Sequence, residues 1–296
     1  MKTTRITATA MAAALVAAIV VSGCKKDEEP ETATKDIYQS DREMMYDNSI
    51  AESSFDDAGN VADEGVTGSL ETYRLAGVEK VLTSCASITL DTVTVPHSVQ
   101  IDFGPTDCLC KDGNYRRGII QVEWMGHYRD SGATHTITFI DYYLNFNKID
   151  GTKAVTNDGH NAAGNLSFSI SVTGSVTIDP QYSYNGTGGT ITFTSSRTRE
   201  WIAGEGTLIW WDDIYLIGGT SQGTTTGGLS YSMSTQAGHP LKKEIGFLHF
   251  TDGILDIAPT GKPVRTIDYG YLNGNRDNLA MFSISGFNFV IYLGKK

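Results

Sequence analysis

The segment Leu166-Ser167-Phe168-Ser169-Ile170-Ser171-Val172 decides the fold class of this chain. Every second residue in it is apolar, and every residue between is serine. This alternation is typical of a strand that buries one face and exposes the other, whereas a helix would need apolar residues three and four positions apart. The segment therefore predicts a half-buried β-strand.

The same alternation recurs along most of the chain. Because the apolar segments are short and no helical pattern separates them, we expect neighbouring strands to pair antiparallel. The further strands are expected around Ile88/Leu90, Val93/Val95, Val99/Ile101/Phe103, Ile119/Val122/Trp124, Ile137/Phe139, Ile191/Phe193, Leu229/Tyr231/Met233, Phe247/His249 and Phe282/Ile284.

Three segments place a polar residue and a glycine between apolar residues: Val172–Val176, Phe250–Ile254 and Ile284–Phe287. Such pairs favour two-residue hairpin turns, because glycine and small polar residues accept positive φ at low cost. Strands and turns together predict a mainly β fold, an antiparallel meander of hairpins that forms a sandwich or an open barrel.

A short helix is expected to precede the strands. Ser40 and Glu43 have the spacing of a capping box, and Asp56-Asp57-Ala58-Gly59-Asn60 is expected to end the helix. The alternative is that this acid-rich segment stays irregular. The apolar stripe of the helix would consist of Met44, Asn48, Ala51 and Phe55.

The N-terminus has the features of a bacterial lipoprotein leader. Lys2 and Arg5 precede the apolar run Ala10–Val21, which is too short to span a bilayer but suits a signal peptide. Val21-Ser22-Gly23-Cys24 resembles a lipobox, so Cys24 is expected to be lipidated after cleavage before it. The alternative is an ordinary secretory signal in which Cys24 is incidental.

The residues after Cys24 predict the location. Lys25, Lys26, Asp27, Glu28 and Glu29 resemble the export signal that sends Bacteroidetes lipoproteins to the outer face of the outer membrane. A solvated charge run in a flexible tether is the simpler interpretation, and the two are compatible. We expect an acyl-anchored protein of the outer membrane that faces the cell exterior.

The chain is expected to contain four regions. These are a signal peptide (1–23), an anchor with an acidic tether (24–36), a short helical segment (37–66) and a single β-rich domain (67–296).

Charge excludes one class of partner. The whole chain has a net charge of −11, and removal of Lys2 and Arg5 with the leader makes it −13. Nucleic acid binding requires basic patches, so nucleic acid is excluded as a partner. Anionic lipid head groups would also repel this protein, so the acyl chains and not electrostatics would hold it to the membrane.

Three cysteines remain after Cys24. Cys85 is expected to form a disulfide with Cys108 or Cys110, which leaves one free thiol; Cys108 and Cys110 are too close in the chain to bridge easily. No histidine lies near the Cys-x-Cys, and the spacing matches no common zinc site. We therefore predict no metal site, and the sequence indicates no cofactor.

An aromatic and charged cluster is the strongest candidate for ligand binding. Trp201, Trp210 and Trp211 could stack on sugar rings, with Arg199 as a hydrogen-bond donor, although strand aromatics more often pack in the core. The same region would hold the carboxylates of a glycoside-active enzyme. Those carboxylates are Glu200, Glu205, Asp212 and Asp213.

A serine motif in this part of the chain is rejected. Gly219-Thr220-Ser221-Gln222-Gly223 matches the G-x-S-x-G of a nucleophile elbow, but no helix is expected after it. The sequence therefore predicts no catalytic centre built on Ser221.

Several ordered blocks carry a resemblance to a known family: 101–104, Cys108, 112–120, 152–157, 197–201, 216–220 and 267–270. Together they resemble an uncharacterised family of Bacteroidetes outer-membrane and surface lipoproteins. The resemblance spans roughly residues 36–296 and implies a location, not an activity. We expect a non-catalytic binding or accessory role with a protein partner in the outer membrane; the alternatives are glycan binding and glycoside chemistry.

Overall fold

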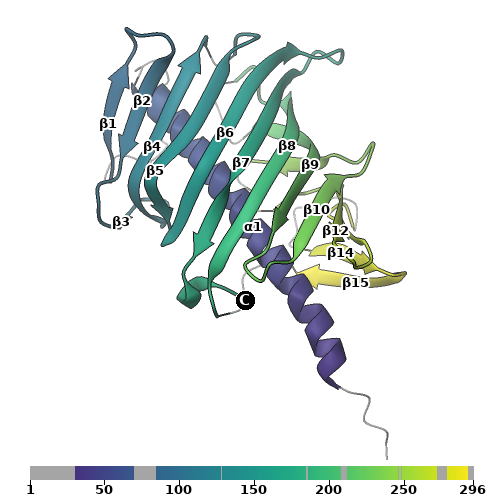
Figure 1. Ribbon diagram of the computed structural model, residues 1–296. Coiled ribbons are helices and arrows are strands. Elements are labelled where there is room, and N and C mark those ends of the chain that lie inside the picture. Colours follow the sequence, from purple (N-terminus) through teal and green to yellow (C-terminus); the bar gives the residue numbers. More distant parts are fainter. Residues whose placement is uncertain are drawn as a thin grey trace, which may run out of the picture.

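The computed structural model describes residues 31–69, 85–127, 129–184, 186–207, 212–245, 247, 249–271 and 279–292. These residues form one long helix and one antiparallel sheet (Figure 1). The prediction of a mainly β meander is confirmed. The sheet is single and not closed, so of the two expected forms, a sandwich or an open barrel, the sandwich is not formed.

The elements follow one another as a helix and then strands joined mostly by short turns. Their bounds are α1 (Glu31–Ser69), β1 (Ser87–Asp91), β2 (His97–Asp102), β3 (Cys108–Leu109), β4 (Tyr115–Met125), β5 (Thr134–Leu144), β6 (Asn147–His160), β7 (Leu166–Ile178), the 3₁₀ turn η2 (Pro180–Tyr182), β8 (Gly189–Ala203), β9 (Ile214–Thr224), β10 (Ser230–Thr235), β11 (Leu241–Glu244), β12 (Ile254–Pro259), β13 (Arg265–Asp268), β14 (Leu279–Ile284) and β15 (Phe287–Tyr292).

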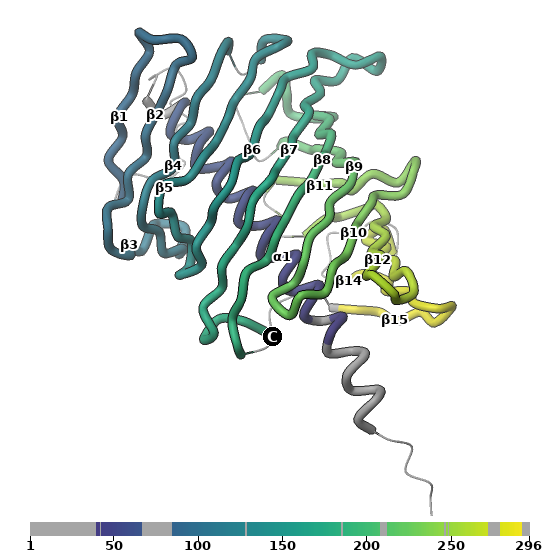
Figure 2. Tube along the Cα trace, viewed as in Figure 1, coloured from purple at the N-terminus to yellow at the C-terminus, as the bar shows by residue number. Residues whose placement is uncertain are grey.

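The strands lie side by side in the sheet nearly in the order in which they follow one another in the sequence. The 15 strands are arranged β1-β2-β4-β5-β6-β7-β8-β9-β10-β12-β13-β14-β15, with β3 beside β4 and β11 beside β9. The sheet curves so that α1 lies along one face and β12–β15 turn toward the helix (Figures 1 and 2). This curvature gives the sheet an inner face toward α1 and an outer face toward water.

The two faces differ in chemistry. The inner face carries the apolar residues of the alternating pattern, and α1 covers it with Phe55, which stacks on Phe193 at a centroid distance of 5.9 Å. On the outer face, hydroxyl side chains align across neighbouring strands. The register places each outward-facing residue of one strand opposite an outward-facing residue of the next. One such row is Thr138, Thr152, Thr173 and Thr194 on β5 to β8.

The helix is longer than expected. It begins at Glu31 and ends at Ser69, so Ser40 lies inside it and not at its start, and residues 31–36 belong to the helix and not to a tether. The expected stop at 56–60 is also wrong. Gly59 lies where a Cβ would be 3.0 Å from the Lys153 ammonium, so the glycine allows β6 to approach α1 and the tertiary contact outweighs its poor helix propensity. The expected stripe is confirmed: Met44, Asn48, Ala51 and Phe55 are all buried.

Most of the expected strands are present, with three corrections. Val93 and Val95 lie in the exposed turn between β1 and β2, and Val93 is 91% exposed. Phe247 and His249 lie in the connection between β11 and β12. Several strands were missed, among them β6, β9, β11 and β13; in β6 polar residues fill much of the strand, so alternation is weak there.

The three expected turns have different outcomes. Ser285 and Gly286 both have positive φ, 49° and 84°, and join β14 to β15 as predicted. Gly174 instead lies within the continuous strand β7, opposite Gly151 of β6. The Asp252-Gly253 segment precedes β12, but Asp252 bridges to Lys242 and no two-residue hairpin is formed.

Candidate functional site

The predicted anchor lies outside the described residues. This applies to Cys24 and to the export-signal residues Lys25, Lys26, Asp27, Glu28 and Glu29. Within the described part of the chain, no helix has the length and apolar character needed to cross a bilayer.

The cysteine pairing left open by the sequence is resolved. Cys85 forms a disulfide with Cys108, and their Cα atoms are 5.7 Å apart. Cys110 is a buried free thiol, and burial raises its pKa. The disulfide therefore links the chain just before β1 to β3, which pairs with β4.

The predicted sugar platform is not formed by Trp201. Its side chain is only 7% exposed, its indole NH donates to Asp213 at 3.2 Å, and its ring packs 5.6 Å from Tyr215. Arg199 stacks over Phe168 and Tyr215, at 5.0 and 5.1 Å from the ring centroids. Both residues contribute to packing, and Trp210 and Trp211 lie outside the described residues.

Each of the neighbouring carboxylates has its own polar partners. Glu200 accepts hydrogen bonds from Asn161 and Asn165, which lower its pKa. Asp213 binds Trp201, and burial raises its pKa. Other partners hold the remaining two: Glu205 contacts His160, and Asp212 contacts Thr207.

The serine motif lies within a strand. Gly219–Gly223 belongs to β9, and the next element is β10 and not a helix. Ser221 accepts a hydrogen bond from Arg197 at 3.1 Å. The expectation that no nucleophile elbow is present therefore agrees with the local structure.

A series of ion pairs joins α1 to the inner face of the sheet. Residues 31–69 contain ten acidic and two basic side chains. Several of the acids contact a basic residue of the sheet, each time on a different strand. These pairs are Asp41 with Arg265 (2.7 Å), Glu52 with Arg197, Asp56 with Lys153 (3.0 Å) and Asp57 with Arg116 (2.5 Å).

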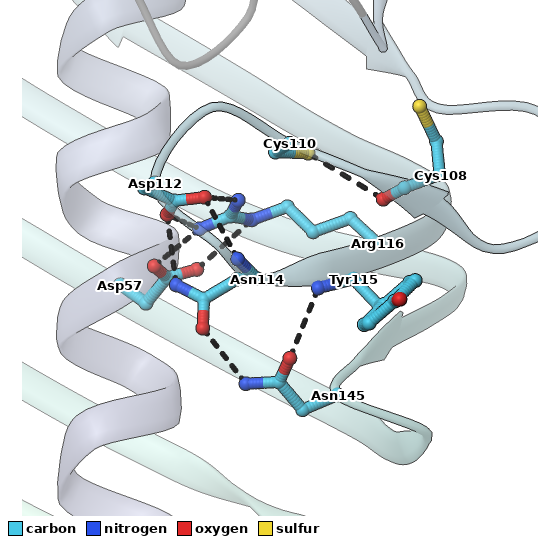
Figure 3. Close-up of polar contacts among 8 residues, drawn as sticks. All are labelled: Asp57, Cys108, Cys110, Asp112, Asn114, Tyr115, Arg116 and Asn145. Atoms are coloured by element: carbon cyan, nitrogen blue, oxygen red, sulfur yellow. Dashed lines mark hydrogen bonds and ion pairs between the residues drawn. The ribbon is translucent and has the colours of Figure 1, made fainter.

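Arg116 is the most enclosed member of this series (Figure 3). It is fully buried, and it binds Asp57 of α1 and Asp112 of the turn before β4, at 2.5 and 2.6 Å. Burial alone would lower the pKa of Arg116, but the hydrogen bonds of Asp112 and the charge of Asp57 outweigh this effect. The pKa of Arg116 therefore lies above its ordinary value. Asn114 links the same turn to Asn145 at 2.8 Å. These contacts make the Arg116 cluster a structural clamp with its charge satisfied.

A cavity of about 390 Å³ lies between the middle of α1 and the inner face. Its acidic lining residues come from the helix and its basic ones from the sheet. The helix wall contributes Glu52, Asp56, Asp57 and Asp63; the sheet wall contributes His135, Lys153, Arg197, Arg199 and Lys243.

Within this cavity Arg197 has an incomplete set of partners. Its Nη2 donates to Glu52 and to Ser221, but its Nη1 is buried without a hydrogen-bond partner. Burial raises the pKa of Glu52, although the charge of Arg197 opposes this. Lys243 donates to the carbonyl of Phe247, a neutral group, and burial lowers the pKa of this lysine.

A second candidate surface is the last strand of the sheet. Among the described residues, β15 pairs only with β14, so its other edge is open. Phe287, Phe289 and Val290 are 67, 42 and 50% exposed. Open, uncharged and apolar strand edges are rare in isolated domains, because they invite pairing with another chain.

The important residues missed from the sequence are single charges on the buried side of strands. Arg197 lies an even number of positions from Ile191 and Phe193 in β8, so it shares their inner face. Lys153 shares the inner face of β6 with Ile149 in the same way. A basic residue at an inward position signals a buried partner, because an unpaired charge there is costly.

Comparisons with protein families, curated proteins and solved structures found no match for this chain.

Proposed function

We propose that this protein is an outer-membrane lipoprotein with a non-catalytic binding role, and that it binds a protein partner of that membrane through β15. The open apolar edge of β15 carries the proposal. The lipobox-like segment ending at Cys24 supports the location.

Strand addition is the binding mode that β15 favours. Its backbone groups on the open edge would pair with an extended segment of the partner, and its exposed side chains would select apolar neighbours. Natural edge strands are commonly protected by charge or proline, and Phe287-Asn288-Phe289-Val290-Ile291-Tyr292 contains neither. The partner is therefore a protein that offers an extended strand with apolar side chains.

The position of β15 supports a partner in the membrane. Met44, in the first half of α1, packs in one cluster with Ala280 of β14 and Ile291 of β15. Only a short stretch of chain separates Cys24 from the start of α1 at Glu31. An acyl anchor at Cys24 would therefore hold this end of the sheet near the bilayer.

Site-specific cross-linking in the native cells tests the partner. A photo-reactive residue at Asn288 is expected to give one reproducible adduct with an outer-membrane protein, whereas the same residue at Thr173, on the exposed outer face of β7, gives none. Equal adducts at both positions, no adduct at Asn288, or an adduct with a second copy of this chain would overturn the proposal.

The anchor is tested separately. Cells grown with an alkyne-labelled fatty acid are expected to label the wild-type chain, and C24S is expected to lose both the label and the outer-membrane fractionation. Retention of the label in C24S would refute lipidation at this cysteine.

A further inference from the structure

We propose that the cavity between α1 and the inner face of the sheet binds an amphipathic carboxylate, a molecule with one carboxylate and an aliphatic or aromatic body. Arg197 is the residue that would bind the carboxylate. This inference is independent of the partner proposed for β15, because the two sites use different parts of the molecule.

The unpartnered nitrogen of Arg197 is the central observation. The side chain is 8% exposed and lines the cavity, and its Nη2 already contacts Glu52 and Ser221. Its Nη1 has no partner although it is buried. A buried donor without an acceptor is unfavourable, and a carboxylate is the acceptor that fits a guanidinium best.

The charges of the two walls are balanced in number, because four helix acids face four cations of the sheet. Of the helix acids, Asp57 is held by the buried Arg116, and Asp56 is 74% exposed and contacts Lys153. Glu52 pairs with Arg197, and the lining also holds Asp63, Arg199 and Lys243. The carboxylate is therefore favoured by the unpartnered Nη1 of Arg197 and not by an excess of positive charge in the lining.

The rest of the cavity is suited to an apolar body. The sheet wall also carries apolar residues, and the cavity volume of about 390 Å³ lies within the range of small-molecule sites. A ligand with a polar head alone would leave this wall in contact with water. The apolar lining includes Val155, Ile170, Val172, Phe193, Ile217 and Phe250.

Fluorescence titration with 11-(dansylamino)undecanoic acid tests the proposal. The full chain carries C24S, so that its own acyl chains do not compete. The acid is expected to bind saturably at one site, and its methyl ester about tenfold more weakly, because the ester lacks the charge that Arg197 would bind. R197K keeps a cation opposite Glu52 but loses the second nitrogen, and it is expected to weaken binding of the acid about tenfold.

Two further variants keep the test decisive. R117K, at an arginine outside the cavity that pairs with Asp107, is the matched control and should bind as the parent does. S195F fills the cavity from β8 without removing a charge and should abolish binding. Equal binding of acid and ester, undiminished binding by S195F, or no saturable binding by a cooperatively folded chain would overturn the proposal.

Discussion

Arg265 and Asp41 lie 224 residues apart in the chain, yet the Nη2 of Arg265 donates to both carboxylate oxygens of Asp41, at 2.7 and 2.9 Å. Both side chains are buried. This pair fixes the first half of α1 to β13, near the other end of the sequence. It belongs to the same series as the Glu52, Asp56 and Asp57 pairs, which fix the second half.

Removal of one partner of this buried pair is expected to destabilise the protein strongly. In D41N, Arg265 stays buried without its counter-charge, so the free energy of unfolding should fall by about 3–5 kcal/mol. Urea denaturation followed by circular dichroism measures this. D107N, which removes the partly exposed partner of Arg117, is the control and should cost at most about 1 kcal/mol. Equal losses in the two variants would show that burial of the pair is unimportant.

The close approach of α1 to β7 depends on Gly174. A Cβ there would lie 2.6 Å from the Phe55 ring and 2.4 Å from the carbonyl oxygen of Asp150. G174A is therefore expected to lower the free energy of unfolding by about 1–3 kcal/mol through overpacking. G206A, where a Cβ meets nothing within 4 Å, is the control. A thermal melt that shows the same loss for both variants would contradict the packing explanation.

His135 is expected to make stability depend on pH. Burial lowers its pKa in the folded state, although the nearby Asp63 opposes this. The unfolded chain then binds more protons as pH falls through the ordinary histidine pKa of about 6.5, so the stabilising contribution of neutral His135 is lost toward pH 5. Denaturant titrations between pH 7 and pH 5 should show a steeper loss for the parent than for H135Q. Parallel pH profiles would rule this contribution out.

Cys110 is expected to resist modification in the folded protein. Its thiol is buried, and the raised pKa reduces the reactive thiolate. In a C24S chain, Ellman's reagent should detect one thiol in urea and react at least about a hundredfold more slowly without urea. Fast reaction of the native chain, or more than one thiol in urea without reductant, would contradict the assigned pairing of Cys85 with Cys108.

The sequence alone determined the features that depend on near neighbours. The alternation in Leu166–Val172 predicted a strand because burial of every second side chain requires extended backbone. The Ser285-Gly286 turn was predictable because its two residues accept positive φ. The stripe from Met44 to Phe55 was predictable because helical spacing places those residues on one face.

Only the tertiary structure decided the length of α1, the partners of its acids and the cavity. Residues 56–60 contain helix-breaking features, but Lys153 and Arg116 hold this segment to the sheet, and these contacts come from strands far along the chain. The unpartnered Nη1 of Arg197 likewise depends on how closely α1 packs on β8. Local patterns report the conformation of a few adjacent residues, whereas the partner of a buried charge is set by the packing of whole elements.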